Sequence, residues 1–343
     1  MRTSHRSTAL VLALTLVPLL AVGAACGTTE DPPERSAPST TVAPDGTGTT
    51  TKTSTGPVTL TDDRGETVTL DAPARRVVAL EWMQVENLVT LGVMPVGVAD
   101  VENYRLYDTA GPLDDTVTDV GTRTEPSENA ILDLEPDLII LEADRSSDLP
   151  DRLGRYAPVM VVQGADGEDN LANMRHAFEL IATAVGKEDR AAEVLDAFDA
   201  RVAEAKEQID ATDPENRRFM IVDGYLQGSS LVIRAFTRAS QLSRVAESIG
   251  LENAWTGEGD DWGLDHTDIE GLADLPDLRF FYGVPGDDDP VADGSLSNPI
   301  WENLPFVRNG HVTRVEPGLW VFGGPASMTM LVDQLVAAYG ADG

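Results

Sequence analysis

The chain has 343 residues, of which 42% are apolar, so it has enough material for one or two packed domains and is not globally disordered. Asp and Glu number 58 against 25 Lys and Arg, and the resulting net charge of -33 disfavours nucleic-acid binding, because it repels phosphates. The single cysteine, Cys26, excludes an intrachain disulfide and a cysteine-based metal cluster.

Residues 1–25 are typical of a signal peptide. Two arginines precede Ala9–Ala25, an apolar run that is short for a spanning helix of about 20 residues. Val22–Cys26 resembles a lipobox, in which the cysteine is acylated, although Gly23 stands where that motif usually has Leu or Val. The alternative is ordinary cleavage that leaves Cys26 as a free thiol. We expect an exported protein that is lipid-anchored at Cys26 to the outer face of the cell membrane, or periplasmic.

Residues 26–57 are expected to form a disordered linker. Thr28–Thr55 is rich in Thr, Ser, Pro and Gly and has almost no large apolar side chain. Such a segment cannot bury enough surface to offset the entropy lost on ordering. It would separate the membrane anchor from the folded part.

Alternating strands and helices predict an N-terminal α/β lobe over residues 58–187. It opens with a hairpin of two short alternating runs, 58–61 and 67–70. The unbroken apolar run of 137–141 is typical of a parallel, fully buried strand. By the same patterns we expect further strands at 77–80, 96–98 and 159–162, and helices at 85–91, 128–134 and 150–155.

A long helical stretch from Asn170 to Ala211, interrupted near Gly186, follows this lobe. Its second part, residues 188–211, spans roughly 36 Å, which is about the width of a small domain. Residues 212–343 then return to the α/β pattern, with strands at 219–222, 231–233, 278–282 and 312–315, and helices at 240–249, 269–275 and 326–339. The predicted fold is therefore two α/β lobes joined by a single long helix, with a ligand cleft between the lobes.

The sequence contains no set of residues that would support catalysis. His176, His266 and His311 are scattered, without the spacing of a metal site. No phosphate-binding glycine loop with its lysine and no nucleophile elbow is present. We expect neither enzymatic activity nor a bound metal or cofactor.

Six aromatic residues lie in segments that follow predicted strands, and in open α/β sheets such segments line the ligand crevice. Each residue alone could equally pack in a hydrophobic core. Together, however, the six come from both lobes and predict a cleft lined by aromatic side chains. They are Trp82, Tyr104, Tyr107, Trp262, Trp320 and Phe322.

Eight stretches, in the same order, resemble the ferric-hydroxamate (ferrichrome-type) siderophore-binding protein of bacterial ABC importers, within the helix-linked substrate-binding protein superfamily. The resemblance extends from about Thr59 to Tyr339. The stretches are Val78–Leu88, Val96–Asp100, Asn103–Leu106, Asp119–Pro126, Asn253–Trp255, Trp262–Gly263, Leu304–Gly310 and Trp320–Gly323.

The resemblance implies that Arg123 donates hydrogen bonds to metal-bound hydroxamate oxygens, which suits a guanidinium. The alternative is that Arg123 forms an ordinary surface ion pair. By the same resemblance, Trp82, Trp262 and Trp320 would form the walls of the site, and Tyr107 and Phe322 replace a Trp and a Tyr of the family. Arg145 stands where the family has its second ligand, a Tyr, and Leu264 replaces a small polar residue. These departures favour a different siderophore, and two arginines would suit one that bears carboxylates.

We therefore expect a monomeric solute-binding lipoprotein that captures a ferric siderophore and delivers it to a membrane permease. The superfamily resemblance implies permease docking through one acid on each lobe, Asp151 and Glu270. Cobalamin or haem is the alternative ligand. The alternatives from other classes are an exported lipoprotein hydrolase and a ligand-sensing partner of a membrane receptor.

Overall fold

The computed structural model describes residues 56–143, 148–212, 216–227, 230–284, 289, 291–292 and 298–340. The predictions for the signal peptide, the linker, Cys26 and Arg145 lie outside the described residues. No helix within the described ranges combines the length and the apolar character needed to cross a membrane.

The N-terminal lobe is built on a five-stranded parallel sheet in the order β5-β4-β3-β6-β7. Strands β6 and β7 are buried along their whole length, as their unbroken apolar runs predicted. The elements are the hairpin β1 (Val58–Thr61) and β2 (Thr67–Leu70), the strands β3 (Val77–Ala79), β4 (Gly97–Val98), β5 (Thr118–Asp119), β6 (Leu138–Glu142) and β7 (Val159–Val162), and the helices α1 (Trp82–Thr90), α2 (Val101–Tyr107), α3 (Glu128–Asp133) and α4 (Leu149–Leu153).

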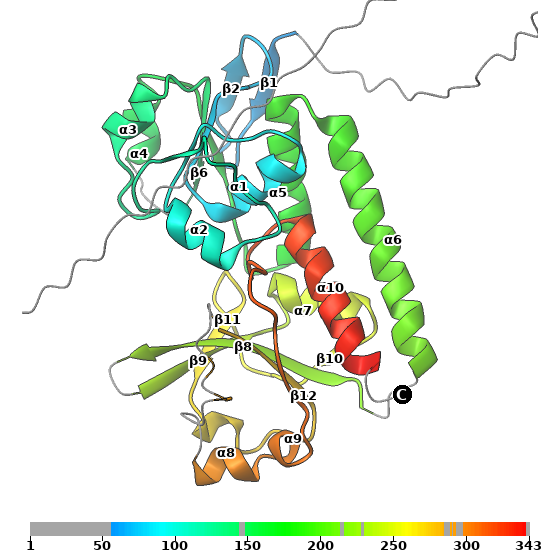
Figure 1. Ribbon diagram of the computed structural model, residues 1–343. Coiled ribbons are helices and arrows are strands. Elements are labelled where there is room, and N and C mark those ends of the chain that lie inside the picture. Colours follow the sequence, from blue (N-terminus) through cyan, green and yellow to red (C-terminus); the bar gives the residue numbers. More distant parts are fainter. Residues whose placement is uncertain are drawn as a thin grey trace, which may run out of the picture. The chain divides into compact units, whose positions relative to one another are not determined.

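Two long helices follow, α5 (Asn170–Val185) and α6 (Glu188–Thr212). The predicted interruption at Gly186 is confirmed: this residue has a φ of 64°, a left-handed conformation that ends α5 and that glycine adopts without steric cost. Glu188 and Asp189 then occupy the first turn of α6, where the helix dipole favours acids. In Figure 1, α6 runs from beside the N-terminal lobe to the level of the sheet in the C-terminal lobe.

The C-terminal lobe is built on a mixed sheet in the order β11-β9-β8-β12-β13, with β10 paired to β8. Strands β8, β12 and β13 are parallel, whereas β9 and β11 run antiparallel to their neighbours. The elements are β8 (Arg218–Gln227), β9 (Ser230–Phe236), β10 (Glu252–Asn253), β11 (Leu264–Thr267), β12 (Arg279–Gly283) and β13 (Val312–Arg314), with α7 (Gln241–Ser248), α8 (Pro299–Asn303), α9 (Pro305–Arg308) and α10 (Pro325–Gly340).

The helix predicted at 269–275 is wrong, because the structure has only a 3-10 turn there, η1 (Glu270–Leu272). Gly271 weakens any helix that contains it, and Pro276 disfavours helical backbone in the residue before it. Together they restrict the segment before the proline to a single 3-10 turn.

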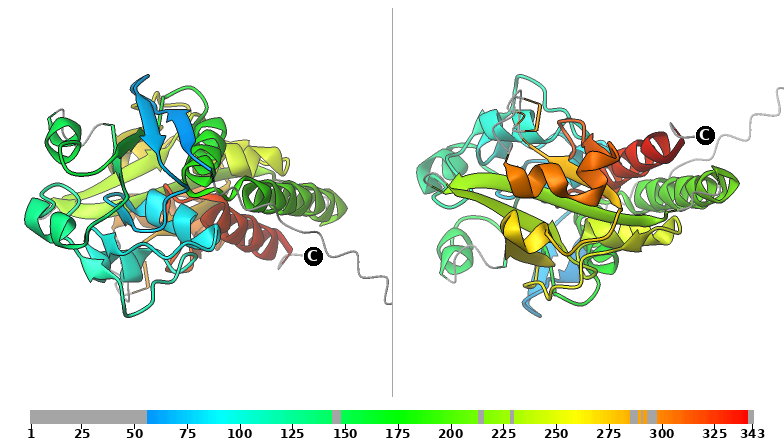
Figure 2. Two further views of the ribbon diagram at one scale, coloured as in Figure 1. Left: turned by 90° about the horizontal axis from the view of Figure 1, so that it is seen from above. Right: turned by 90° about the horizontal axis from the view of Figure 1, so that it is seen from below.

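Helix α10 adds a second connection between the lobes. It lies beside α6 in both views and also contacts α1 of the N-terminal lobe (Figure 1, Figure 2). Its buried residues Met328, Leu331 and Leu335 pack in one hydrophobic cluster with Phe198 of α6. The two lobes are thus joined covalently by α6 and held by packing along α10.

Candidate functional site

A cavity of about 530 Å³ opens between the two lobes, a size typical of small-molecule sites. Both lobes contribute to its lining, so a ligand in it would contact both at once. The lining residues are Glu81, Trp82, Met83, Asp100, Asn103, Tyr107, Arg123, Glu142 and Gly164 of the N-terminal lobe, and Arg234, Trp262, Leu264, Trp320 and Phe322 of the C-terminal lobe.

The topology of the N-terminal sheet explains why these residues meet. Parallel strands bring their carboxyl ends to one edge of a sheet, where ligands bind in open α/β folds. Each of the five strands contributes at or just beyond that edge: Glu81 and Trp82 after β3, Asp100 after β4, Arg123 after β5, Glu142 at the end of β6 and Gly164 after β7.

The aromatic rings form a continuous wall across the two lobes. The ring centroids of Trp82 and Tyr107 are 5.5 Å apart in a stacked arrangement, and Trp82 meets Trp320 of the other lobe edge-on at 4.7 Å. Phe322 continues the wall, at 5.5 Å from Trp320 and 4.9 Å from Trp262. These distances and angles are those of favourable aromatic pairs. Five of the six predicted aromatic residues therefore do line one cavity.

Tyr104 does not line the cavity, so its assignment to the cleft is wrong. The residue is fully buried, and its hydroxyl donates a hydrogen bond to the carbonyl oxygen of Gly111 at 2.6 Å. Helix α2, which the sequence analysis did not predict, turns Tyr104 into the core of the lobe and leaves Tyr107 at its C-terminal end to reach the cavity.

Arg123 is held at the cavity wall by two kinds of contact. Its Nη1 donates to Glu81 Oε1 at 2.7 Å, and its guanidinium carbon lies 3.8 Å from the Trp82 ring centroid. The side chain is 23% exposed. The ion pair that was the alternative for Arg123 is thus present, and both of its members line the cavity.

Arg234 is a lining residue that the sequence analysis missed. It is directly opposite Asp223 in the β8–β9 ladder, and the two form a bidentate pair, with Nε donating to Oδ1 at 2.6 Å and Nη2 donating to Oδ2. A charged residue inside an apolar strand, Leu231–Phe236, was the available signal, because such a charge needs a partner.

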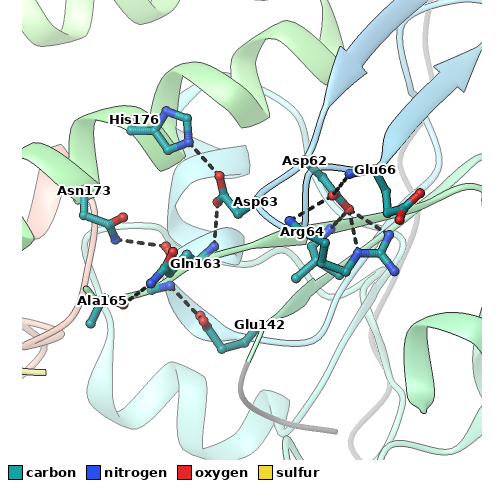
Figure 3. A network of polar contacts seen from close by, with 11 residues as sticks. Asp62, Asp63, Arg64, Glu66, Glu142, Gln163, Ala165, Asn173 and His176 are labelled. Carbon is teal, nitrogen blue, oxygen red and sulfur yellow. Dashed lines mark hydrogen bonds and ion pairs between the residues drawn. The ribbon is translucent and has the colours of Figure 1, made fainter. Parts of the chain in front are cut away.

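The loop after β7 is fixed by a network of polar contacts (Figure 3). Glu142 Oε1 accepts from the Gly164 N–H at 2.8 Å, and the Gln163 N–H donates to Asp63 Oδ2 at 2.7 Å. Asp63 Oδ1 in turn lies 2.7 Å from His176 Nε2 of α5. A Cβ at Gly164 would lie 2.5 Å from Trp262 Cη2, so only glycine allows this close approach between the lobes.

A buried carboxylate joins the lobes behind the aromatic wall. Glu86 of α1 accepts from the Ser327 N–H through Oε1 at 2.9 Å and from the Ser327 hydroxyl through Oε2 at 2.7 Å. Ser327 lies in the first turn of α10, where backbone N–H groups lack partners within the helix. The Ser327 hydroxyl also accepts from the Trp320 N–H at 3.3 Å, so this contact positions the wall.

Asp108, also buried, lies next to Glu86. Its Oδ1 accepts from the N–H groups of Ala110 and Gly111, whereas its Oδ2 has no hydrogen-bond partner within the described ranges. Burial, with the nearby Glu86 as the next contribution, raises the pKa of Asp108 to about 9. Burial also raises the pKa of Glu86, against the hydrogen bonds from Ser327. Two such carboxyls would share a proton near neutral pH.

Replacing Asp108 with asparagine should therefore flatten the pH dependence of stability. Between the ordinary pKa of 3.8 and about 9 the folded state holds a proton that the unfolded chain has lost, so this site lowers the free energy of unfolding as pH rises. The amide of the substituted asparagine would supply the missing donor at every pH. Denaturant unfolding from about pH 5 to 9 should show that the free energy of unfolding of Asp108→Asn rises relative to that of the wild type as pH rises. The control Asp115→Asn, at an exposed residue, should show the same pH dependence as the wild type. Equal slopes of unfolding free energy against pH in all three proteins would contradict the shared proton.

Among the described residues, no group of three or more His, Cys, Asp or Glu side chains is placed to hold a metal ion.

Comparisons with known proteins point to binding proteins of iron carriers. Residues 77–318 match the model of the periplasmic binding protein family. The iron(3+)-hydroxamate-binding protein FhuD of Escherichia coli is 31% identical over 265 residues, which cover 77% of this chain and 87% of that protein. The Fe(3+)-citrate-binding protein YfmC of Bacillus subtilis is 28% identical over 281 residues, 81% of this chain and 85% of that protein.

A solved structure shows the same fold. The siderophore-binding protein FhuD from Vibrio cholerae, bound to Fe3+-Desferal, superposes with a TM-score of 0.69 at 28% identity and covers 77% of this chain and 97% of its own.

Proposed function

The chain belongs to the periplasmic binding protein family, and from that premise we propose that it is the solute-binding component of a ferric-siderophore ABC importer. The observation that carries this proposal is the cavity shared by the two lobes, in which Arg123 lies against an aromatic wall. The resemblance found in the sequence is confirmed by the family match and by the relatives.

The site would bind its ligand without catalysing a reaction. The siderophore holds the iron, while the guanidinium of Arg123 donates to the partly negative oxygens around the metal and the rings of Trp82, Trp262 and Trp320 pack on the organic part. Delivery to a permease completes the function. The match to the periplasmic binding protein family supports export. The lipid anchor at Cys26, the monomeric state and the domain limits 58–187, 188–211 and 212–343 stay predictions from the sequence.

The charges in the cavity favour a hydroxamate ligand. The described part of the lining has three carboxylates, Glu81, Asp100 and Glu142, and two arginines, Arg123 and Arg234. Each arginine is already paired with a carboxylate. A ferric trihydroxamate core is neutral, whereas anionic ferric citrate would have to compete with Glu81 and Asp223 for the two guanidinium groups. The carboxylate-bearing siderophore that Arg123 together with Arg145 suggested stays a prediction, because Arg145 lies outside the described residues. Neither cobalamin nor haem is favoured by a particular contact.

Ferric trihydroxamates should quench the tryptophan fluorescence of the protein in a saturable way. Three of its five tryptophans, Trp82, Trp262 and Trp320, line the cavity, and the ferric complex absorbs in the near ultraviolet. A fluorescence titration with the ferric complex, corrected for its absorbance with free tryptophan, measures this. Quenching no greater than that of free tryptophan would contradict the proposed ligand.

A further inference from the structure

A smaller cavity adjoins the main one. It has a volume of about 210 Å³ and shares three side chains of its lining, Tyr107, Arg234 and Trp320, with the 530 Å³ cavity. We call it the side chamber. Its other lining residues include Leu106, Asp223, Val315, Glu316 and Leu319.

The chemistry of the side chamber differs from that of the main cavity. Aliphatic side chains dominate its walls, among them Leu106, Val315 and Leu319. Of its two carboxylates, Asp223 is paired with Arg234. Leu106 is 45% exposed, which makes it one of three large hydrophobic side chains that are exposed in the described part of the chain. Leu106 thus adds an exposed apolar wall to a chamber whose other leucine and valine side chains are buried or half-buried.

We propose that the side chamber binds an aliphatic arm of the siderophore, such as the acyl chain at one end of a linear trihydroxamate. This inference rests on the proposed function, because the arm must belong to a ligand whose ferric core lies against Arg123 and Trp82. The volume is roughly seven times the ~30 Å³ that a water molecule occupies. It therefore accommodates a chain of several carbons.

Burial of the arm predicts a dependence of affinity on chain length. Each methylene that leaves water strengthens binding by about fourfold when it is fully buried. The gain should stop once the chain fills the side chamber and further carbons remain in solvent. A ligand without the arm should still bind, since the contacts to its ferric core lie in the main cavity.

The test uses ferric linear trihydroxamates that differ only in their terminal acyl group, from acetyl to octanoyl, titrated against the full chain. Two variants are compared with the wild type. Leu106→Glu places a charge in the wall of the side chamber, and Ile300→Glu makes the same change at another exposed hydrophobic residue that lines neither cavity. We expect affinity to rise roughly tenfold or more along the series in the wild type and in Ile300→Glu, and to stay nearly flat in Leu106→Glu.

The outcomes separate the two proposals. If the acetyl compound binds and affinity does not change with chain length in the wild type, the side chamber has no such role and the siderophore-binding function stands. An equal rise in Leu106→Glu would assign the gain to non-specific partition and overturn the inference. If no member of the series binds, the proposed function itself fails.

Discussion

Reversing Asp151 and Glu270 to lysine together should abolish cellular uptake of the ferric siderophore while its affinity for the purified protein stays unchanged. Both carboxylates are exposed, and neither has a hydrogen bond or ion pair within the described ranges. Asp151 is in the first turn of α4, and Glu270 begins η1, so each lobe presents one of them. Unpaired exposed acids are suited to a basic partner surface, and a like charge opposite such a surface costs several kcal/mol.

A matched double reversal controls for the change in net charge. Asp115→Lys with Glu207→Lys changes the charge by the same amount, at exposed positions in the N-terminal lobe and on α6. Uptake of radiolabelled ferric trihydroxamate should persist in cells with this control and disappear with the first pair. Asp151 also borders a groove that contains Arg64 and Arg155. The two single reversals, measured separately, show which lobe contributes more to docking. Normal transport by Asp151→Lys/Glu270→Lys would remove both residues from the docking surface.

Replacing Arg123 with alanine should weaken binding of a ferric trihydroxamate by roughly 10- to 150-fold, which corresponds to the 1.5–3 kcal/mol of a charge-assisted hydrogen bond. The guanidinium is preorganised by Glu81 and Trp82, so little entropy is lost when it meets the ligand. Arg123→Lys should give an intermediate loss, because lysine keeps the charge but not the fork of donors.

Two controls separate binding from folding in this experiment. Arg238→Ala removes an exposed arginine that pairs with Glu247 and lines neither cavity, so its affinity should equal that of the wild type. Thermal unfolding of Arg123→Ala shows whether the lobes remain intact when Glu81 loses its partner. A folded Arg123→Ala that binds as tightly as the wild type would show that the residue only forms an ion pair.

The sequence predicted the parts of the fold whose signal is local. Strand β7 was predicted to the residue, since a buried parallel strand requires an unbroken apolar run, and the end of α5 followed from the need for a glycine at residue 186. The same reasoning missed α8 and α9, which have only five and four residues, because helices this short leave no periodicity to detect.

The site was predictable where a residue follows a strand and not where its place depends on tertiary contacts. Trp82 was found because it follows a predicted strand, whereas Arg123 was implied only by the family resemblance, since the two-residue strand β5 before it was not predicted. The contact of Glu86 with Ser327 joins residues 241 positions apart, and no local pattern indicates it. Tyr104 and Tyr107 both looked like cleft residues, and only the orientation of α2 separates the buried one from the one in the wall.

The most direct test of the account is a competition experiment on the purified full chain. The protein is loaded with a fluorescent ferric trihydroxamate and challenged with the non-fluorescent ferric trihydroxamate, its metal-free form, a ferric catecholate, ferric citrate, haem and cobalamin. Binding that depends on Arg123 and the aromatic wall predicts that the ferric trihydroxamate displaces the probe at the lowest concentration and that the metal-free form is much weaker. Failure of the probe to bind, or stronger displacement by haem or cobalamin, would contradict a ferric-siderophore binding protein.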